Sequence, residues 1–88
     1  MSMTAAANAE STMVRDGADG QKLFQLGMMY ASGNSVPADM VAAHKWFNIA
    51  AMRGNSEAAR LRREIAGEMS EAEIAAAQRA ARVWLTRH

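Results

Sequence analysis

Histidine is the side chain most often used for proton transfer near neutral pH, and the chain contains two, His44 and His88. On a single helix, the partner of a base or metal ligand would lie about one turn away. The residues one turn from His44 are Met40, Phe47 and Asn48, and none of them is acidic. We therefore predict that His44 is an ordinary histidine on the surface of a helix.

Acid–base chemistry or nucleic-acid binding would instead require a segment that is rich in charge. The segment in question is residues 57–68. Its charged residues are Glu57, Arg60, Arg62, Arg63, Glu64 and Glu68. Glu64 and Glu68 are one helical turn apart, but arginines precede them, so we expect ion pairing on a solvated helix rather than an acid pair. No aromatic side chain lies among the arginines to stack on bases, which leaves a nucleic-acid accessory protein as the weakest of three possible functions.

The composition excludes several further classes of site. The 88 residues include no cysteine, so the chain has neither disulfides nor thiolate metal sites, which suits the cytoplasm. The net charge of +1 argues against binding nucleic acid or an anionic membrane by bulk electrostatics. No apolar run approaches the roughly 20 residues that span a bilayer, and no phosphate-binding glycine loop is present. We expect no enzymatic activity, no cofactor and no metal site.

Four helices must position these side chains. The pattern predicts helices over residues 20–32, 39–53, 56–67 and from 70 to about 85. Asp19 and Asp39 are expected to cap the first two helices, and Ser70 with Glu73 forms a capping box at the start of the fourth. The second helix is apolar on more than one side, so we expect it to lie between the first and third helices.

The first two predicted helices resemble one Sel-one-like repeat, a relative of the tetratricopeptide repeat. The matching residues are Leu26, Gly27, Tyr30, Gly33, Val36, Asp39, Ala43, Trp46, Ala50, Ala51 and Gly54. Lys22, at a position where the family has a small residue, and Asn34-Ser35 in the loop depart from the pattern. The resemblance implies two antiparallel helices that stack on further copies and bind other proteins.

A second, decayed copy follows the first. Ala58 lies 36 residues after Lys22, a spacing typical of helical repeats, but Arg62-Arg63 replaces Leu-Gly and Ala66 replaces Tyr. We therefore predict an all-α fold: a short right-handed α-solenoid of two hairpins, with the second repeat degenerate and capping. Residues 1–18 are expected to be a flexible tail, and residues 19–88 the repeat domain.

The resemblance places candidate partner-binding residues on the concave face, which the first helix of each hairpin lines. These residues are Gln21, Phe24, Met28, Ser32, Glu57, Arg60 and Glu64. They predict a non-enzymatic adaptor that holds a peptide or helix of another protein, with Arg60 anchoring a carboxylate. We further expect the protein to be bacterial and cytoplasmic. The alternative is a structural homo-oligomer, most simply a homodimer, that uses the same surface for self-association.

Overall fold

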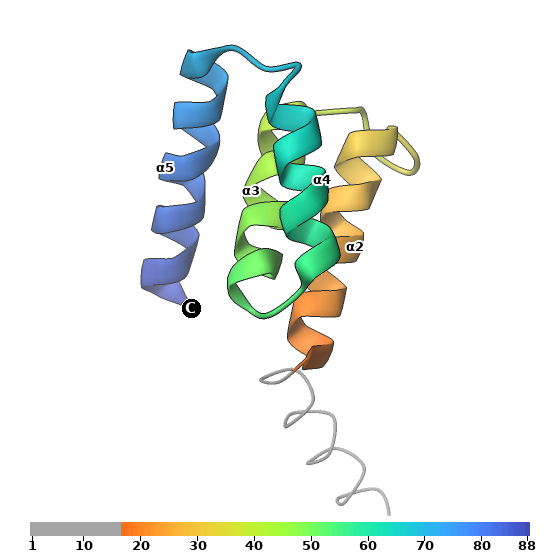
Figure 1. Ribbon diagram of the computed structural model, residues 1–88, viewed down its shortest axis with the longest axis vertical. Helices are drawn as coiled ribbons and strands as arrows, with labels where there is room; N and C mark the ends of the chain where they lie inside the picture. Colours follow the sequence, from red (N-terminus) through yellow and green to blue (C-terminus); the bar gives the residue numbers. More distant parts are fainter. Residues whose placement is uncertain (1–16) are drawn as a thin grey trace, which may run out of the picture.

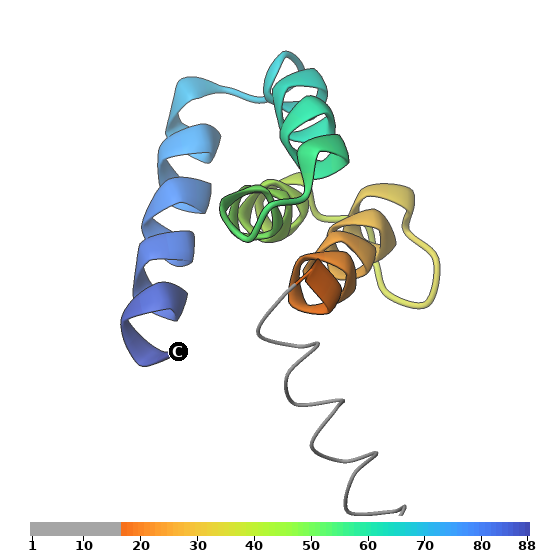
Figure 2. The ribbon, with the colours of Figure 1, turned by 60° about the horizontal axis from the view of Figure 1, so that its bottom comes forward.

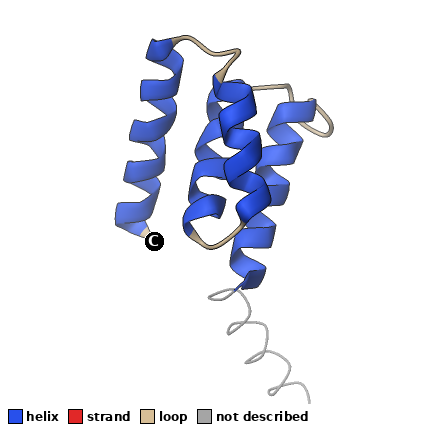
Figure 3. Ribbon diagram, in the orientation of Figure 1, coloured by secondary structure: helices blue, strands red, loops and turns tan. Residues whose placement is uncertain are grey.

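The computed structural model describes residues 17–88 as four α-helices joined by short loops (Figures 1 and 3). The helices are α2 (Gly17–Ser32), α3 (Met40–Met52), α4 (Ser56–Ala66) and α5 (Glu71–Arg87). Over this part of the chain the prediction of an all-helical fold with four helices is confirmed. The predicted tail lies outside the described residues up to position 16, whereas Gly17 and Ala18 already belong to α2.

The early start of α2 corrects the expected role of Asp19. Because the helix begins at Gly17, Asp19 lies in its first turn and cannot be the capping residue. Its carboxylate instead forms an ion pair with Arg53, which follows the last turn of α3. The side chain therefore ties the two helices of the first hairpin together at their open end.

Helix α3 is the centre of the molecule and packs against the other three helices (Figure 2). Phe47, Ile49, Ala43 and Ala50 are each at most 1% exposed, and they point to more than one side of the helix. The prediction that this helix lies between neighbours is confirmed, and α5 is a third neighbour in addition to the two that were expected.

Close approach of α2 to α3 depends on glycine. A methyl group added at Gly27 would lie 2.5 Å from two ring carbons of Phe47, and one added at Gly20 would lie 3.1 Å from the carbonyl oxygen of Arg53. At both glycines α2 therefore approaches through its backbone, meeting the Phe47 side chain at Gly27 and backbone carbonyl oxygens of Ala50 and Arg53 at Gly20. This contact explains why Gly27 stands where almost any other residue would separate the hairpin.

Caps and a left-handed glycine define the helix ends. The side chains of Asp39 and Ser70 accept from the expected backbone amides, and the predicted capping box of Ser70 and Glu73 is complete. The sequence analysis did not identify Asn55, whose Oδ1 accepts from the Ala58 amide at 2.8 Å and caps α4. Gly33, at φ 78°, ends α2 in a conformation that favours glycine.

The other three helices are arranged around α3. Figure 2 shows α2 and α4 on one side of α3, and α5 on the other side. Such an arrangement is compatible with two stacked hairpins, α2–α3 and α4–α5. It leaves two regions to consider for function, the solvent-exposed rows of α2 and α4 and the junction of α3 with α5.

Candidate functional site

The seven residues that the sequence predicts for partner binding lie in two rows, one on α2 and one on α4, and we call the two rows together the α2–α4 face. Both helices pack on α3, but they do not pack against each other. The face consists of Gln21, Phe24, Met28 and Ser32 on α2, and Glu57, Arg60 and Glu64 on α4. The four α2 residues recur at steps of three and four, which places them in one row along the helix. Within residues 17–88, no hydrogen bond or ion pair joins this row to the row on α4.

The α2 row is an apolar ridge with polar ends. Met28 is 42% exposed, whereas Phe24 is half-buried with its ring centroid 5.7 Å from that of Phe47. Phe47 is itself buried, so it supports Phe24 from below and holds the ring in place. The hydroxyl of Ser32 donates to the Met29 carbonyl at 3.3 Å, so its hydrogen is already used within the last turn of α2.

The α4 row neutralises most of its own charge. Arg60 forms ion pairs with both Glu57 and Glu64, three residues before it and four residues after it. The hydrogen bond from Arg60 lowers the pKa of Glu57, and the same contact raises the pKa of Arg60. The predicted charge pairing is confirmed here. A partner carboxylate that approached Arg60 would have to displace one of these glutamates.

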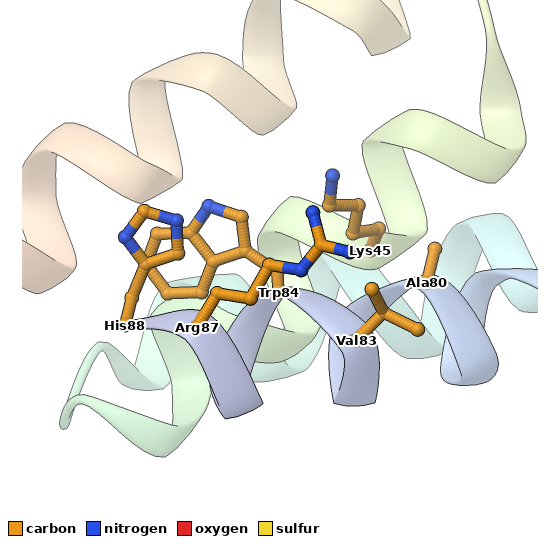
Figure 4. Close-up of a pocket in the computed structure, with 6 residues that line it drawn as sticks. All are labelled: Lys45, Ala80, Val83, Trp84, Arg87 and His88. Carbon is orange, nitrogen blue, oxygen red and sulfur yellow. The ribbon is translucent and has the colours of Figure 1, made fainter.

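The second surface is a groove between α3 and α5, which we call the α3–α5 groove (Figure 4). Its volume is about 370 Å³, and it is lined by Lys45, Ala80, Val83, Trp84, Arg87 and His88. Within α5, the buried residues Ala77 and Ala81 face α3. Because both side chains are small, α5 approaches closely, and the next strip of the helix, with Ala80 and Val83, borders the open space.

Aromatic contacts fix the wall of the groove. The indole of Trp84 meets that of Trp46 edge to face, with ring centroids 5.6 Å apart at 81°. The His88 ring stacks on Trp84 at 4.3 Å and 16°, and the guanidinium of Arg53 lies 5.8 Å from the Trp84 ring. Trp84 is therefore held on several sides, and its position does not depend on a ligand.

The groove carries two cationic side chains and no acidic side chain among its lining residues. The Lys45 ammonium lies 4.1 Å from the centre of the Trp46 ring, a cation–π contact. In Figure 4 the Arg87 side chain extends along the groove toward Lys45. All ion pairs within residues 17–88 use Arg53 or Arg60, so neither groove cation is neutralised there.

This second surface was not predicted from the sequence. One signal was present, because Ala80, Trp84 and His88 recur at four-residue steps and Arg87 lies beside them. That spacing places an aromatic strip and a cation on one side of a helix. Nothing in the sequence indicates that Lys45, on another helix, completes the groove.

The expectation that His44 lies on a helix surface is wrong. The predicted surface histidine is only 3% exposed, and its Nδ1 atom has no hydrogen-bond partner. It is buried because α4 packs on this side of α3, where Arg62 donates to Asn48 Oδ1 at 2.7 Å. Burial lowers the pKa of His44, and the positive charge of Arg62 lowers it further. Arg62 is likewise a contact between helices, in contrast to the expected solvated arginine.

Two further observations concern metals and membranes. Within residues 17–88, histidine, aspartate and glutamate side chains do not gather in threes as a metal site would require. In the same range, every helix is too short or too polar to cross a bilayer.

Comparisons with protein-family models, with curated proteins and with solved structures found no match to the chain. The Sel-one-like resemblance therefore rests on the residues of one hairpin and stays a prediction.

Proposed function

We propose that this chain is a non-enzymatic protein-interaction module, an adaptor that binds a peptide or helix of a partner protein on the α2–α4 face. The observation that carries the proposal is the ridge of Phe24 and Met28, an apolar strip that the other helices leave open to solvent. An amphipathic helix presents apolar residues at the same three- and four-residue steps and fits such a ridge.

The two ridge residues have complementary properties. Phe24 is supported by Phe47, so little side-chain freedom is lost when a partner covers it. Met28 is flexible and adapts to the shape of different partners. Together they provide a fixed contact and an adjustable one, one helical turn apart.

The α4 row then favours a particular charge on the partner. Arg60 offsets only one of the two glutamates with which it pairs, so the row has a net charge of −1. A lysine or arginine beside the apolar residues of the partner would suit this row better than the carboxylate that the sequence analysis expected for Arg60.

The repeat identity and the location belong to the same proposal. We propose that α2–α3 is a Sel-one-like repeat and that α4–α5 is its degenerate copy. The contact of Gly27 with Phe47 supports this identity, since it gives a reason for the glycine of the Leu-Gly pair. A cytoplasmic location is proposed from the composition, which lacks cysteine.

A displayed library of helical peptides, selected against the full chain, tests the proposed function. We expect binders with an apolar stripe flanked by basic residues. Their affinity should fall at least about tenfold in Met28→Glu and stay within about twofold in Met52→Glu, because Met52 is an even more exposed methionine but lies on another helix. Equal losses in both variants, or no binders, would contradict the proposal.

Self-association is the alternative use of the same ridge. Light scattering over a dilution series distinguishes the two. A monomer at all concentrations supports the adaptor. A dimer that dissociates in Met28→Glu, but not in Met52→Glu, would instead assign the ridge to a second copy of the chain.

A further inference from the structure

A second binding site follows from the α3–α5 groove. We propose that this groove binds an acidic segment of a partner protein, with a carboxylate held between Lys45 and Arg87 and a neighbouring apolar side chain placed on Ala80 and Val83. This site is separate from the α2–α4 face, and it prefers the opposite charge.

The charge of the groove is the first argument. Lys45 and Arg87 line one small space, and no aspartate or glutamate side chain lines it with them. Like charges in one groove repel each other, and an anion placed between them would convert this repulsion into two attractions. Arg87 can also hold a carboxylate through two parallel hydrogen bonds. The groove is therefore complementary to a carboxylate.

The apolar part of the groove is the second argument. Val83 is 53% exposed, although it is a large apolar residue, and it lies next to Ala80 on the open strip of α5. Trp84 and the stacked His88 form the adjoining wall. A ligand that carried charge alone would leave Val83 and Ala80 uncovered. A ligand that combines a carboxylate with an apolar side chain would pair with the cations and also cover Val83 and Ala80.

The pre-formed wall is the third argument. Because Trp46 and His88 hold Trp84 in place, the groove exists without a ligand, and binding does not have to order this side chain. A volume of about 370 Å³ holds a few side chains. It suits a short linear segment better than a folded domain.

The arrangement of the other arginines on α5 favours a peptide over a nucleic acid. Arg82 precedes Arg87 by five residues, which turns it roughly 140° around the helix, and neither Arg82 nor Arg79 lines the groove. A nucleic acid would need cations that continue along its backbone, and the groove offers two. Binding of a nucleic acid is therefore the competing outcome of the test.

Selection from a displayed library of random heptapeptides tests the site. We expect enrichment of sequences with aspartate or glutamate next to an apolar residue. The matched variants are the doubles Lys45→Gln/Arg87→Gln and Arg79→Gln/Arg82→Gln, which remove the same charge inside and outside the groove. Only the first should lose the enrichment and weaken binding of the selected peptide by at least about tenfold. Melting temperatures of both variants check that they fold.

Nuclear magnetic resonance spectra of the full chain locate the bound peptide. The selected peptide should shift the Trp84 indole and Lys45 resonances and leave those of Met28 unchanged. Enrichment without acidic residues, equal losses in both double variants, or no enrichment would overturn the proposal. Tighter binding of an eight-nucleotide single-stranded DNA to the same resonances, or shifts that depend on protein concentration alone, would overturn it in favour of a nucleic acid or a second copy. Because Met28→Glu should leave this binding unchanged, the groove can fail independently of the α2–α4 face.

Discussion

The α2–α4 face and the α3–α5 groove show two ways of using charge on one small helical scaffold. On α4, Arg60 lies between two glutamates of its own helix, at spacings that the helix itself dictates. In the groove, Lys45 and Arg87 come from different helices, and neither has a carboxylate partner within residues 17–88. Charges that are close in sequence tend to neutralise each other, whereas tertiary packing can bring together charges that have no local partner.

The aromatic residues differ in a similar way. Phe24 depends on one neighbouring ring, Phe47. Trp84 contacts Trp46 and His88, so the groove wall is held from two sides. We therefore expect the ridge to be the more adaptable surface and the groove the more rigid one. The following experiments separate the two surfaces, beginning with the largest expected effect.

Replacement of Trp84 by alanine should damage the groove most. The change removes the contacts with Trp46 and His88 and part of the packing of α5 on α3, at a cost of about 3 kcal/mol in the free energy of unfolding. Urea denaturation measures this loss. Val83→Ala, which shortens the exposed neighbour, should cost less than about 0.5 kcal/mol. Similar losses in both variants would mean that the aromatic contacts do not hold α5.

Replacement of Gly27 by alanine should damage the other surface. The new methyl group would overlap the Phe47 ring, so α2 must move, at a cost of about 1–3 kcal/mol. Gly67→Ala is the control, because a methyl group there meets only a carbonyl oxygen at 3.4 Å. We expect a lower urea midpoint and weaker peptide binding on α2 for Gly27→Ala alone, with binding in the groove retained. An unchanged midpoint would contradict the close contact of the two helices.

Acid should lower the free energy of unfolding, because His44 is buried between α3 and α4. Its pKa is lowered in the folded protein, so below pH 6.5 the unfolded chain binds the proton more readily than the folded one. Above pH 6.5, His44 is neutral in both states and the free energy of unfolding is not reduced by its protonation. Below pH 6.5 the free energy of unfolding falls as the pH falls, by at most about 1.4 kcal/mol per pH unit. Urea denaturation between pH 5 and 7.5 measures the slope.

Two variants test whether His44 causes this pH dependence. His44→Gln should lose it over the measured range, whereas His88→Gln, which changes the exposed histidine of the groove, should retain it. Retention in His44→Gln would show that another group titrates between the folded and unfolded states.

Replacement of Arg60 by glutamine should have the smallest effect on stability. Both of its ion pairs are exposed to solvent, so we expect no measurable change in melting temperature. The variant should nevertheless bind basic peptides on the α2–α4 face more tightly, because two glutamates then remain without a cation. Weaker binding would restore Arg60 as the anchor that the sequence analysis expected.

Local sequence patterns predicted much of this fold because their causes are local. The capping box of Ser70 and Glu73, the Asp39 cap and the break at Gly33 each involve residues within one or two turns. The failures involve partners that are distant in sequence. Asp19 pairs with Arg53 and not with its own helix end, and the burial of His44 requires α4 to cover α3.

The same distinction applies to the two surfaces. By itself, the sequence determined the helices, the caps of α3 and α5, the small residues at the hairpin seam and the composition of each row on the α2–α4 face. Only the tertiary structure decided that α5 packs on α3, which brings Lys45 beside Trp84 and Arg87. The physical reason is that helix periodicity specifies which side chains share a face, whereas the choice of neighbouring helix depends on how all the apolar faces are buried together.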